Sequence, residues 1–194
     1  MPGHHSPTQR VYEIAEEQHG YFTTKQANDA GVDPRSVVMM ARRGAAERVS
    51  RGVYRLRRFP ESAYGQYMHA ILWPHGVLGV ISHESALTLY GMSDVNPSKV
   101  HITVPQAHRV RRQVPQFLIL HRADLSPHEI ETVEGLRTTR PVRTIRDCAE
   151  EHLSSALLRQ AIDDGHRIGR LTASEAKELE SELFGSHYDG RSRS

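Results

Sequence analysis

The chain has 194 residues, of which 38% are hydrophobic and 25% are charged, a composition typical of an ordinary folded protein. It contains a single cysteine, Cys148, which excludes an internal disulfide, and no apolar stretch approaches the roughly 20 residues of a membrane span. Because the first residues also lack the apolar segment of a signal peptide, we expect a cytoplasmic protein without a membrane partner.

The positive charge is concentrated in the N-terminal part of the chain. The net charge is only +2, but residues 35–58 hold eight arginines against a single acidic residue, Glu47. Residues 59–194 hold 15 basic and 17 acidic groups, so the positive excess lies before them. Such a concentration of charge on one small segment indicates a polyanionic partner there.

Three short helices are predicted in this basic part of the chain. Apolar residues recur at helical spacing over residues 8–19. Thr23 can cap a second helix, with Gln26 three residues later completing a capping box. Asp33, which is followed by a proline, can cap a third helix that we expect to reach about Arg43.

The pattern changes after the third helix. Val49, Val53 and Leu56 lie on either side of a tight turn at residues 50–52, as in a β-hairpin. A helix, a short helix, a tight turn, a third helix and a hairpin, in this order, predict a winged helix-turn-helix domain. We expect this domain to occupy residues 8–75.

The following residues, 76–184, predict a second domain of mixed α/β type. Ser82 and Gly91 bound one of its helices, and Thr138 or Thr139 can cap another. Strand-like runs lie at 77–82, 101–105 and 116–122, with a short strand within 125–137, and helices are expected at 62–72, 83–90, 142–151, 154–164 and 173–184. The protein is thus predicted to be α+β, with disordered ends at residues 1–7 and 185–194.

The predicted third helix and hairpin present a candidate DNA-binding surface. On the helix, Arg35, Met39 and Arg42 or Arg43 share one face, and Val37, Val38 and Ala41 are expected to face the core. Arginine can contact guanine in the major groove, and Ser36 near the helix start suits a phosphate or a base edge. Arginines of the hairpin would follow the DNA backbone or the minor groove: Arg48, Arg51, Arg55, Arg57 and Arg58. The alternative is a basic face that only contacts solvent.

Metal and catalytic sites are not evident in the sequence. The histidines at 69, 75, 83, 101, 108, 121 and 128 show no metal-binding spacing, so no metal or other cofactor is predicted. His83 and Glu84 occupy adjacent positions on one helix, which favours capping and packing against a strand over a ligand pair. Glu175 and Lys177 resemble part of a nuclease motif but lie in a predicted surface helix. We therefore predict no catalytic residues and no enzyme.

A second group of arginines lies near the helix predicted at 142–151. Four of them, Arg137, Arg140, Arg143 and Arg146, surround a short apolar stripe. Pairing with acidic residues of the 150s and 160s is the favoured interpretation, and a second binding surface for DNA or a partner is the alternative. Cys148 is interpreted as a small core residue.

Several of these segments, taken together, resemble the AbiEi family of antitoxins. The matching segments are GYFTTKQANDAGV (20–32), RRG (42–44) followed by ERVSRGVYRL (47–56), SHESALTLYGM (82–92), VHITVP (100–105) and TTRPVRTIRDCA (138–149). The resemblance implies an N-terminal winged helix that binds inverted repeats in the promoter of its own operon. It also implies a C-terminal domain that counteracts a nucleotidyltransferase toxin of a type IV, abortive-infection system without a stable complex. The DNA contacts would then involve Arg35, Ser36, Met39, Arg42, Arg43, Arg48, Arg51 and Arg55.

Two other functions remain open at the level of the sequence. One is a nuclease of the mismatch-repair endonuclease type that is targeted by its winged helix and uses Asp147 or Glu175. The other is a plain transcription factor whose C-terminal domain senses a ligand or pairs subunits.

Overall fold

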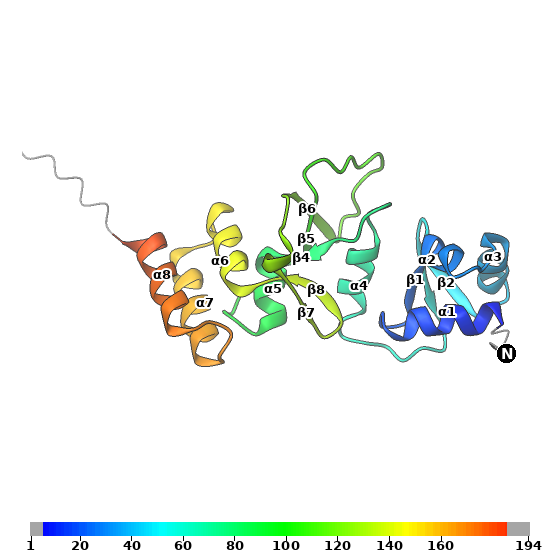
Figure 1. Ribbon diagram of the computed structural model, residues 1–194, viewed down its shortest axis with the longest axis horizontal. Coiled ribbons are helices and arrows are strands. Elements are labelled where there is room, and N and C mark those ends of the chain that lie inside the picture. The colour runs from blue at the N-terminus through cyan, green and yellow to red at the C-terminus, as the bar shows by residue number, and fades with distance from the viewer. Residues whose placement is uncertain (1–5, 186–194) are drawn as a thin grey trace, which may run out of the picture.

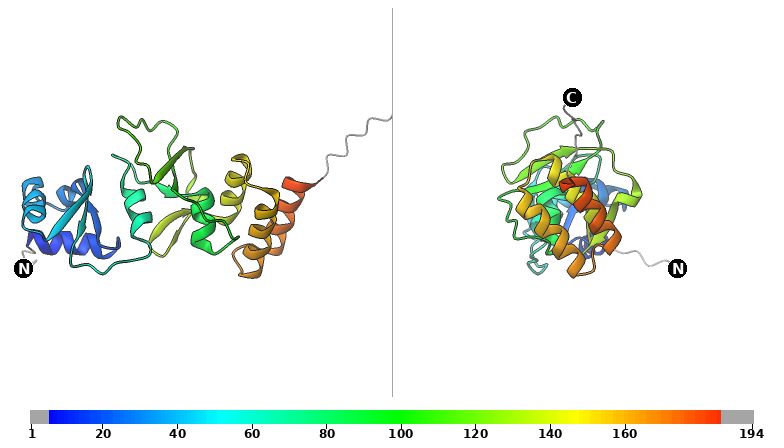
Figure 2. Two further views of the ribbon diagram at one scale, coloured as in Figure 1. Left: turned by 180° about the vertical axis from the view of Figure 1, so that it is seen from behind. Right: turned by 90° about the vertical axis from the view of Figure 1, so that its left-hand side faces the viewer.

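The computed structural model describes residues 6–185, and within them the chain forms two modules that follow one another along its long axis (Figures 1 and 2). The ends predicted as disordered, 1–7 and 185–194, lie outside the described residues apart from Ser6, Pro7 and Gly185. Ser6 caps the first helix and Pro7 is its first residue. The first module comprises α1 (Pro7–Glu16), β1 (Tyr21–Thr23), α2 (Thr24–Asp29), α3 (Pro34–Arg42), β2 (Ala46–Ser50) and β3 (Val53–Leu56).

The starts predicted for α2 and α3 are confirmed. The Thr23 hydroxyl accepts from the Gln26 amide at the start of α2 while the Gln26 side chain accepts from the Thr23 amide, so both halves of the capping box are present. The Asp33 carboxylate accepts from the Arg35 amide at 2.6 Å and caps α3. Beyond the end of α3, Gly44 has a φ of +74°, a conformation that costs glycine little.

A small antiparallel sheet in the order β1-β3-β2 completes a winged helix-turn-helix, as predicted. The β2–β3 hairpin is the wing. Its turn lies at Arg51 and Gly52, and the Gly52 carbonyl accepts from the Thr24 amide at 2.9 Å. The helices close over the sheet around a core of their own that contains Val11, Ala15, Phe22, Ala27, Val32, Val37, Met40, Ala46, Tyr54 and Leu56.

The second module is built on a mixed sheet in the order β6-β5-β4-β8-β7. In Figure 1, α4 lies between this sheet and the first module, and α5, α6, α7 and α8 follow on the other side of the sheet. The elements are α4 (Gly65–Leu72), β4 (Val80–Ile81), α5 (His83–Tyr90), β5 (Val100–Val104), β6 (Leu118–Arg122), the 3-10 turn η1 (Pro127–Glu129), β7 (Ile130–Val133), β8 (Leu136–Thr139), α6 (Pro141–Glu150), α7 (Ser155–Arg167) and α8 (Ala173–Phe184).

The packing of α4 places the division between the modules earlier than residue 75. Met68, Ile71 and Leu72 are buried in the second core, together with the residues of the mixed sheet. The core of the first module reaches only to Phe59. Since α4 turns its apolar face toward the mixed sheet, it belongs to the second module, and the division falls in the connection between Phe59 and α4.

Two expected caps in the second module are replaced by other contacts. Ser82 holds the N-cap position of α5 but makes no side-chain cap bond, and its hydroxyl accepts from Thr103 Oγ1 at 2.8 Å instead. The N-cap of α6 is Arg140 rather than Thr138 or Thr139. Because Thr139 lies in β8, its hydroxyl contacts that of Thr144 inside the core. In both cases the hydroxyl that we expected to cap a helix forms a hydrogen bond with a residue of another element instead.

Candidate nucleic-acid interface

The exposed face of α3 carries most of the predicted DNA-binding residues. Arg35, Met39, Arg42 and Arg43 are exposed, and Ser36 is half-buried. The helix lies at the end of the molecule farthest from the second module, so no part of that module covers it (Figure 1). Two arginines at the C-terminal end of the helix also complement its dipole.

The inner face of α3 differs from the prediction at one position. Val37 and Met40 are buried in the first core, three residues apart, as helical periodicity requires. Val38, which we expected in the core, is 42% exposed beside Met39. The outer face of α3 therefore combines positive charges with an apolar strip.

The arginines of the wing have unequal surroundings. Arg48 on β2 and Arg51 in the turn are exposed, as are Arg57 and Arg58 after β3. Arg55 is half-buried on β3, and its guanidinium donates to the carbonyl oxygens of Phe59 and Pro60 at 3.0 and 3.2 Å. It also lies 3.8 Å from the Glu47 carboxylate. Arg55 thus holds the connection that leaves the wing.

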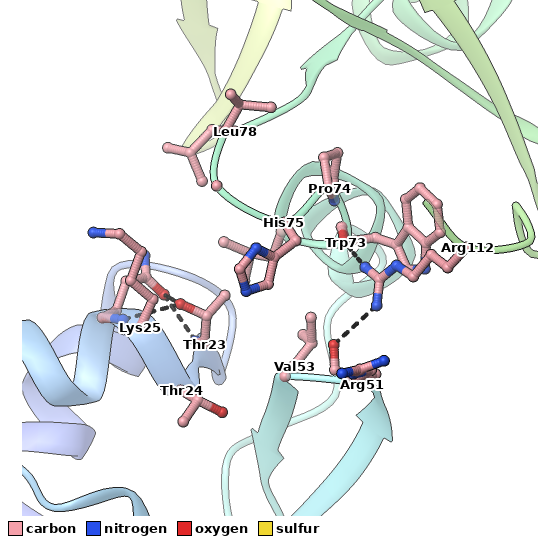
Figure 3. Close-up of a pocket in the computed structure, with 15 residues that line it drawn as sticks. Thr23, Thr24, Lys25, Arg51, Val53, Trp73, Pro74, His75, Leu78 and Arg112 are labelled. Atoms are coloured by element: carbon pink, nitrogen blue, oxygen red, sulfur yellow. Dashed lines mark hydrogen bonds between the residues drawn. The ribbon is translucent and has the colours of Figure 1, made fainter. Parts of the chain in front are cut away.

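The tip of the wing rests against the second module (Figure 3). Arg112, from the loop between β5 and β6, donates to the Arg51 carbonyl at 3.1 Å and also to the Trp73 carbonyl. Its guanidinium lies 4.2 Å from the centre of the Trp73 ring. Burial, followed by the nearby Arg51 charge, lowers the pKa of Arg112. A cleft of about 250 Å³ opens between Lys25, Arg51, His75 and Arg112.

A second contact between the modules is made by His19. Its Nε2 donates to the Glu134 carbonyl at 2.8 Å, in the turn between β7 and β8. Its Nδ1 lies 3.1 Å from the Ser62 hydroxyl in the connection to α4. The first module is therefore fixed to the second at the wing and at the end of α1.

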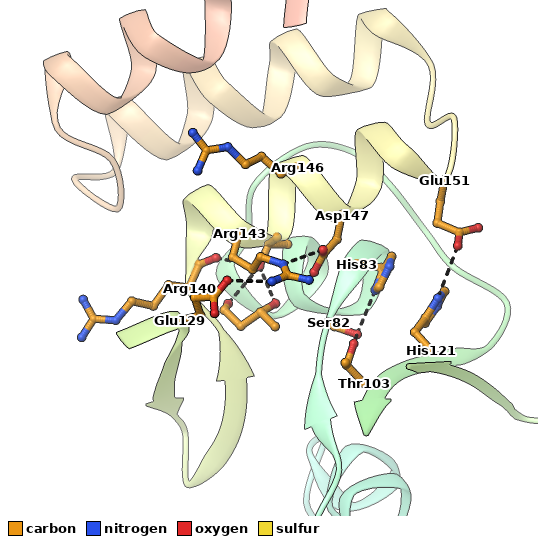
Figure 4. Close-up of polar contacts among 12 residues, drawn as sticks. Ser82, His83, Thr103, His121, Glu129, Arg140, Arg143, Arg146, Asp147 and Glu151 are labelled. Carbon is orange, nitrogen blue, oxygen red and sulfur yellow. Dashed lines mark hydrogen bonds and ion pairs between the residues drawn. The ribbon is translucent and has the colours of Figure 1, made fainter. Parts of the chain in front are cut away.

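Two of the four arginines in the second group are paired with acidic residues, and Figure 4 shows the pairs of Arg143. Arg143 donates to Glu129 at 2.6 Å and to Asp147 at 2.7 Å, and Arg146 pairs with carboxylates of α8. The pairing interpretation is correct for these two, but the partners are Glu129, Asp147, Glu178 and Glu182 rather than residues of the 150s and 160s. The reason is that η1 and α8 pack beside α6. Arg137 and Arg140 are exposed.

The residues considered for a nuclease do not form a common site. Asp147 is buried against Arg143, and burial raises the pKa of its carboxyl. Glu175 accepts from the amide and hydroxyl of Thr172 at the start of α8, and these bonds lower its pKa. Each carboxylate therefore has a local structural partner. Cys148 is buried as expected, which raises its pKa.

The fold and the comparisons with family models identify the class and then the family. A winged helix followed by a mixed α/β domain, with an exposed basic recognition helix, is the architecture of a DNA-binding transcriptional regulator. Residues 9–57 match the family "Transcriptional regulator, AbiEi antitoxin", and residues 76–163 match "AbiEi antitoxin C-terminal domain". The chain belongs to the AbiEi antitoxin family, as its motifs predicted. These families are of the regulator and antitoxin type rather than enzymes.

A solved structure shares the fold. The crystal structure of the RV2827C protein from Mycobacterium tuberculosis matches with a TM-score of 0.53 and 16% identity, over 91% of this chain and 72% of that one. At this identity the likeness concerns the fold alone. No curated protein matches the chain. None of the helices described in residues 6–185 has the length and apolar character that a membrane span requires.

Proposed function

We propose that this protein is the antitoxin and autorepressor of a type IV toxin–antitoxin operon. It binds inverted repeats in its own promoter through the first module and counteracts a nucleotidyltransferase toxin encoded beside it. The observation that carries the DNA-binding part is the position of α3. Its basic outer face lies at the free end of the molecule, on a helix whose inner face is fixed in a core.

We assign most of the DNA contacts to residues of α3 and the wing whose side chains are exposed. On α3, Arg35, Arg42 and Arg43 supply charge, and Met39 with Val38 offers an apolar surface that suits a thymine methyl group. Ser36 lies near the N-terminus of the helix, where a hydroxyl and free amides suit a phosphate. On the wing, Arg48 and Arg51 are exposed and contact phosphates, whereas we assign the half-buried Arg55 to the connection after β3.

The test is binding to promoter DNA over a range of salt concentrations. Each phosphate contact contributes about 0.9 to the slope of log affinity against log salt. Arg42→Ala with Arg43→Ala should weaken binding to the promoter and flatten this slope by about 0.9 for each lost contact. The matched control is Arg137→Ala with Arg140→Ala, which removes two exposed arginines from the second module. Equal losses in the two double variants would refute a specific role for α3.

The antitoxin part of the proposal is supported by the match of residues 76–163 to the AbiEi C-terminal domain. Because the family counteracts its toxins without a stable complex, co-expression should restore the growth of cells that express the neighbouring nucleotidyltransferase. The toxin should not be retained on the immobilised antitoxin. Failure of co-expression to restore growth would contradict this part while leaving the DNA-binding part intact.

A further inference from the structure

Three histidines that are far apart in the sequence converge in the second module. His83 is the first residue of α5, His101 lies in β5 and His121 lies in β6. One ring nitrogen from each lies within 4.8 Å of the others. The sequence shows no metal-binding spacing because each of the three histidines comes from a different element of the fold.

The sheet register explains why they meet. β5 and β6 are parallel neighbours, with His101 opposite Ile119 and Thr103 opposite His121. Side chains two residues apart on a strand lie on the same face of the sheet, so His101, Thr103 and His121 share one face. Ser82, at the start of α5, contacts Thr103 on that face and thereby places His83 above the two strand histidines.

The ring geometry is close to that of a metal-ligand set. Nδ1 of His101 and Nε2 of His121 are 3.1 Å apart. Two nitrogens bound tetrahedrally to zinc at about 2.0–2.1 Å are separated by about 3.4 Å. The His83 ring lies over the His121 ring with 3.6 Å between centroids, and one of its nitrogens lies within 4.8 Å of a nitrogen of each of the other two rings.

The outer nitrogens of two of the rings already have partners (Figure 4). Nδ1 of His121 lies 3.5 Å from a carboxylate oxygen of Glu151, and Nδ1 of His83 lies 2.9 Å from the Ser82 hydroxyl. Metal-binding histidines use their second nitrogen in this way, to a carboxylate or another polar group, which fixes the tautomer and the ring orientation. With Nδ1 of both rings engaged in this way, Nε2 is the nitrogen that each ring offers as a metal ligand.

The surroundings keep the imidazoles in the form that binds metals. Burial, followed by the neighbouring histidines, lowers the pKa of His83 to about 3, and burial, followed by His121, lowers that of His101 to about 4. Neutral imidazole is the ligand form. His83 also has a φ of +53°, an uncommon conformation for a residue with a side chain and one that gathers at functional sites.

We infer that His83, His101 and His121 form a binding site for a divalent transition-metal ion of the zinc type. Three imidazoles without a thiolate favour such an ion, and the absence of a hard oxygen set among them disfavours calcium and magnesium. Three protein ligands leave a fourth position for water, with Glu151 as the outer partner of His121. Bound metal would join the start of α5 to β5 and β6. This inference does not depend on the proposed function.

The test uses the purified full-length protein freed of metal with a chelator and then titrated with Co²⁺ or Zn²⁺. One Co²⁺ per chain should give the visible absorption of tetrahedral cobalt, and Zn²⁺ should displace it and raise the melting temperature. His101→Gln and His121→Gln should abolish this absorption. His128→Gln, which changes an exposed histidine of the same module, should retain it. Metal binding by the remaining histidines contributes equally to the wild-type protein and to each variant, so it does not affect the comparison.

Glu151, the exposed partner of His121, offers a variant that leaves the three histidines unchanged. Glu151→Gln should weaken Zn²⁺ binding about 10- to 100-fold, the usual cost of losing an outer partner, while Glu150→Gln, the neighbouring exposed glutamate, should not. Circular dichroism establishes that each variant is folded. If the wild-type protein takes up no more Co²⁺ than His101→Gln, the cluster is a hydrogen-bonded group of histidines and the inference is wrong.

Discussion

Arg48 and Arg55 lie on the two strands of one hairpin, and their surroundings differ. The Arg48 side chain is exposed, and its Nε donates to the nearby Ser50 carbonyl at 3.4 Å. The Arg55 side chain is 13% exposed and donates to two carbonyls of the following connection. The sequence shows the same basic residue type at both positions. The distinction depends on where the chain turns after β3, which no local pattern reveals.

This contrast predicts opposite effects of two substitutions. Arg55→Ala should lower the free energy of unfolding by about 1–3 kcal/mol, since it removes two hydrogen bonds worth roughly 0.5–1.5 kcal/mol each. It should leave the salt dependence of promoter binding unchanged. Arg48→Ala should leave stability unchanged and flatten the salt slope by about 0.9. Urea unfolding and binding titrations at several salt concentrations measure the two quantities. A flatter slope for Arg55→Ala would return that residue to the DNA-contacting set.

Elements with local start and stop signals could be predicted from the sequence, and contacts between elements could not. Thr23, Asp33 and Gly44 act through neighbouring residues, so α2 and α3 were placed correctly. The prediction of the core-facing residues of α3 was only partly correct, because Val38 lies near the boundary of the buried face and is exposed. The histidine cluster was missed because His83, His101 and His121 meet through sheet register and helix packing, which local spacing does not encode.

The contact between η1 and α6 shows how a pairing of distant elements affects stability. Hydrogen bonds from the Ser126 amide, followed by the Arg143 guanidinium, lower the pKa of Glu129 from its ordinary value of 4.5 to about 2. Arg143 also binds Asp147, so it joins the carboxylates of η1 and α6. A carboxylate whose pKa is lower in the folded state stabilises that state above its unfolded pKa.

This pairing predicts a specific loss of stability in acid. The contribution of Glu129 should be fully present above about pH 4.5 and should be lost as the pH falls toward about 2. Glu129→Gln should therefore be less stable than the wild-type protein near neutral pH, and this difference should shrink in acid. Urea unfolding midpoints across this range provide the measurement. Glu150→Gln, an exposed carboxylate of α6, is the control, and a pH-independent deficit for Glu129→Gln would contradict the assignment.

At the scale of the whole molecule, two modules are held in one arrangement by apolar packing and by polar contacts. Val53 of the wing is buried in the core of the second module, and Tyr21 and Val49 pack against that core. His19 binds the Glu134 carbonyl at one end of the junction, and Arg112 binds the wing at the other. His69 contributes between them, with Nε2 3.0 Å from the Ser50 hydroxyl and its ring stacked on Tyr21. Because α3 points away from this junction, the wing is the proposed DNA-contacting element whose position depends on the second module.

Arg112→Ala tests this dependence. The substitution removes the cation–π contact with Trp73, worth roughly 0.5–2 kcal/mol, and the hydrogen bond to the Arg51 carbonyl. The wing should then separate from the second module about tenfold more often, because about 1.4 kcal/mol corresponds to tenfold in an equilibrium. Amide hydrogen exchange in the wing and trypsin cleavage after Arg57 or Arg58 should both become faster. Arg111→Ala, an exposed arginine of the same loop, should leave both rates unchanged. Equal rates in the two variants would mean that the remaining contacts of the junction suffice to hold the wing.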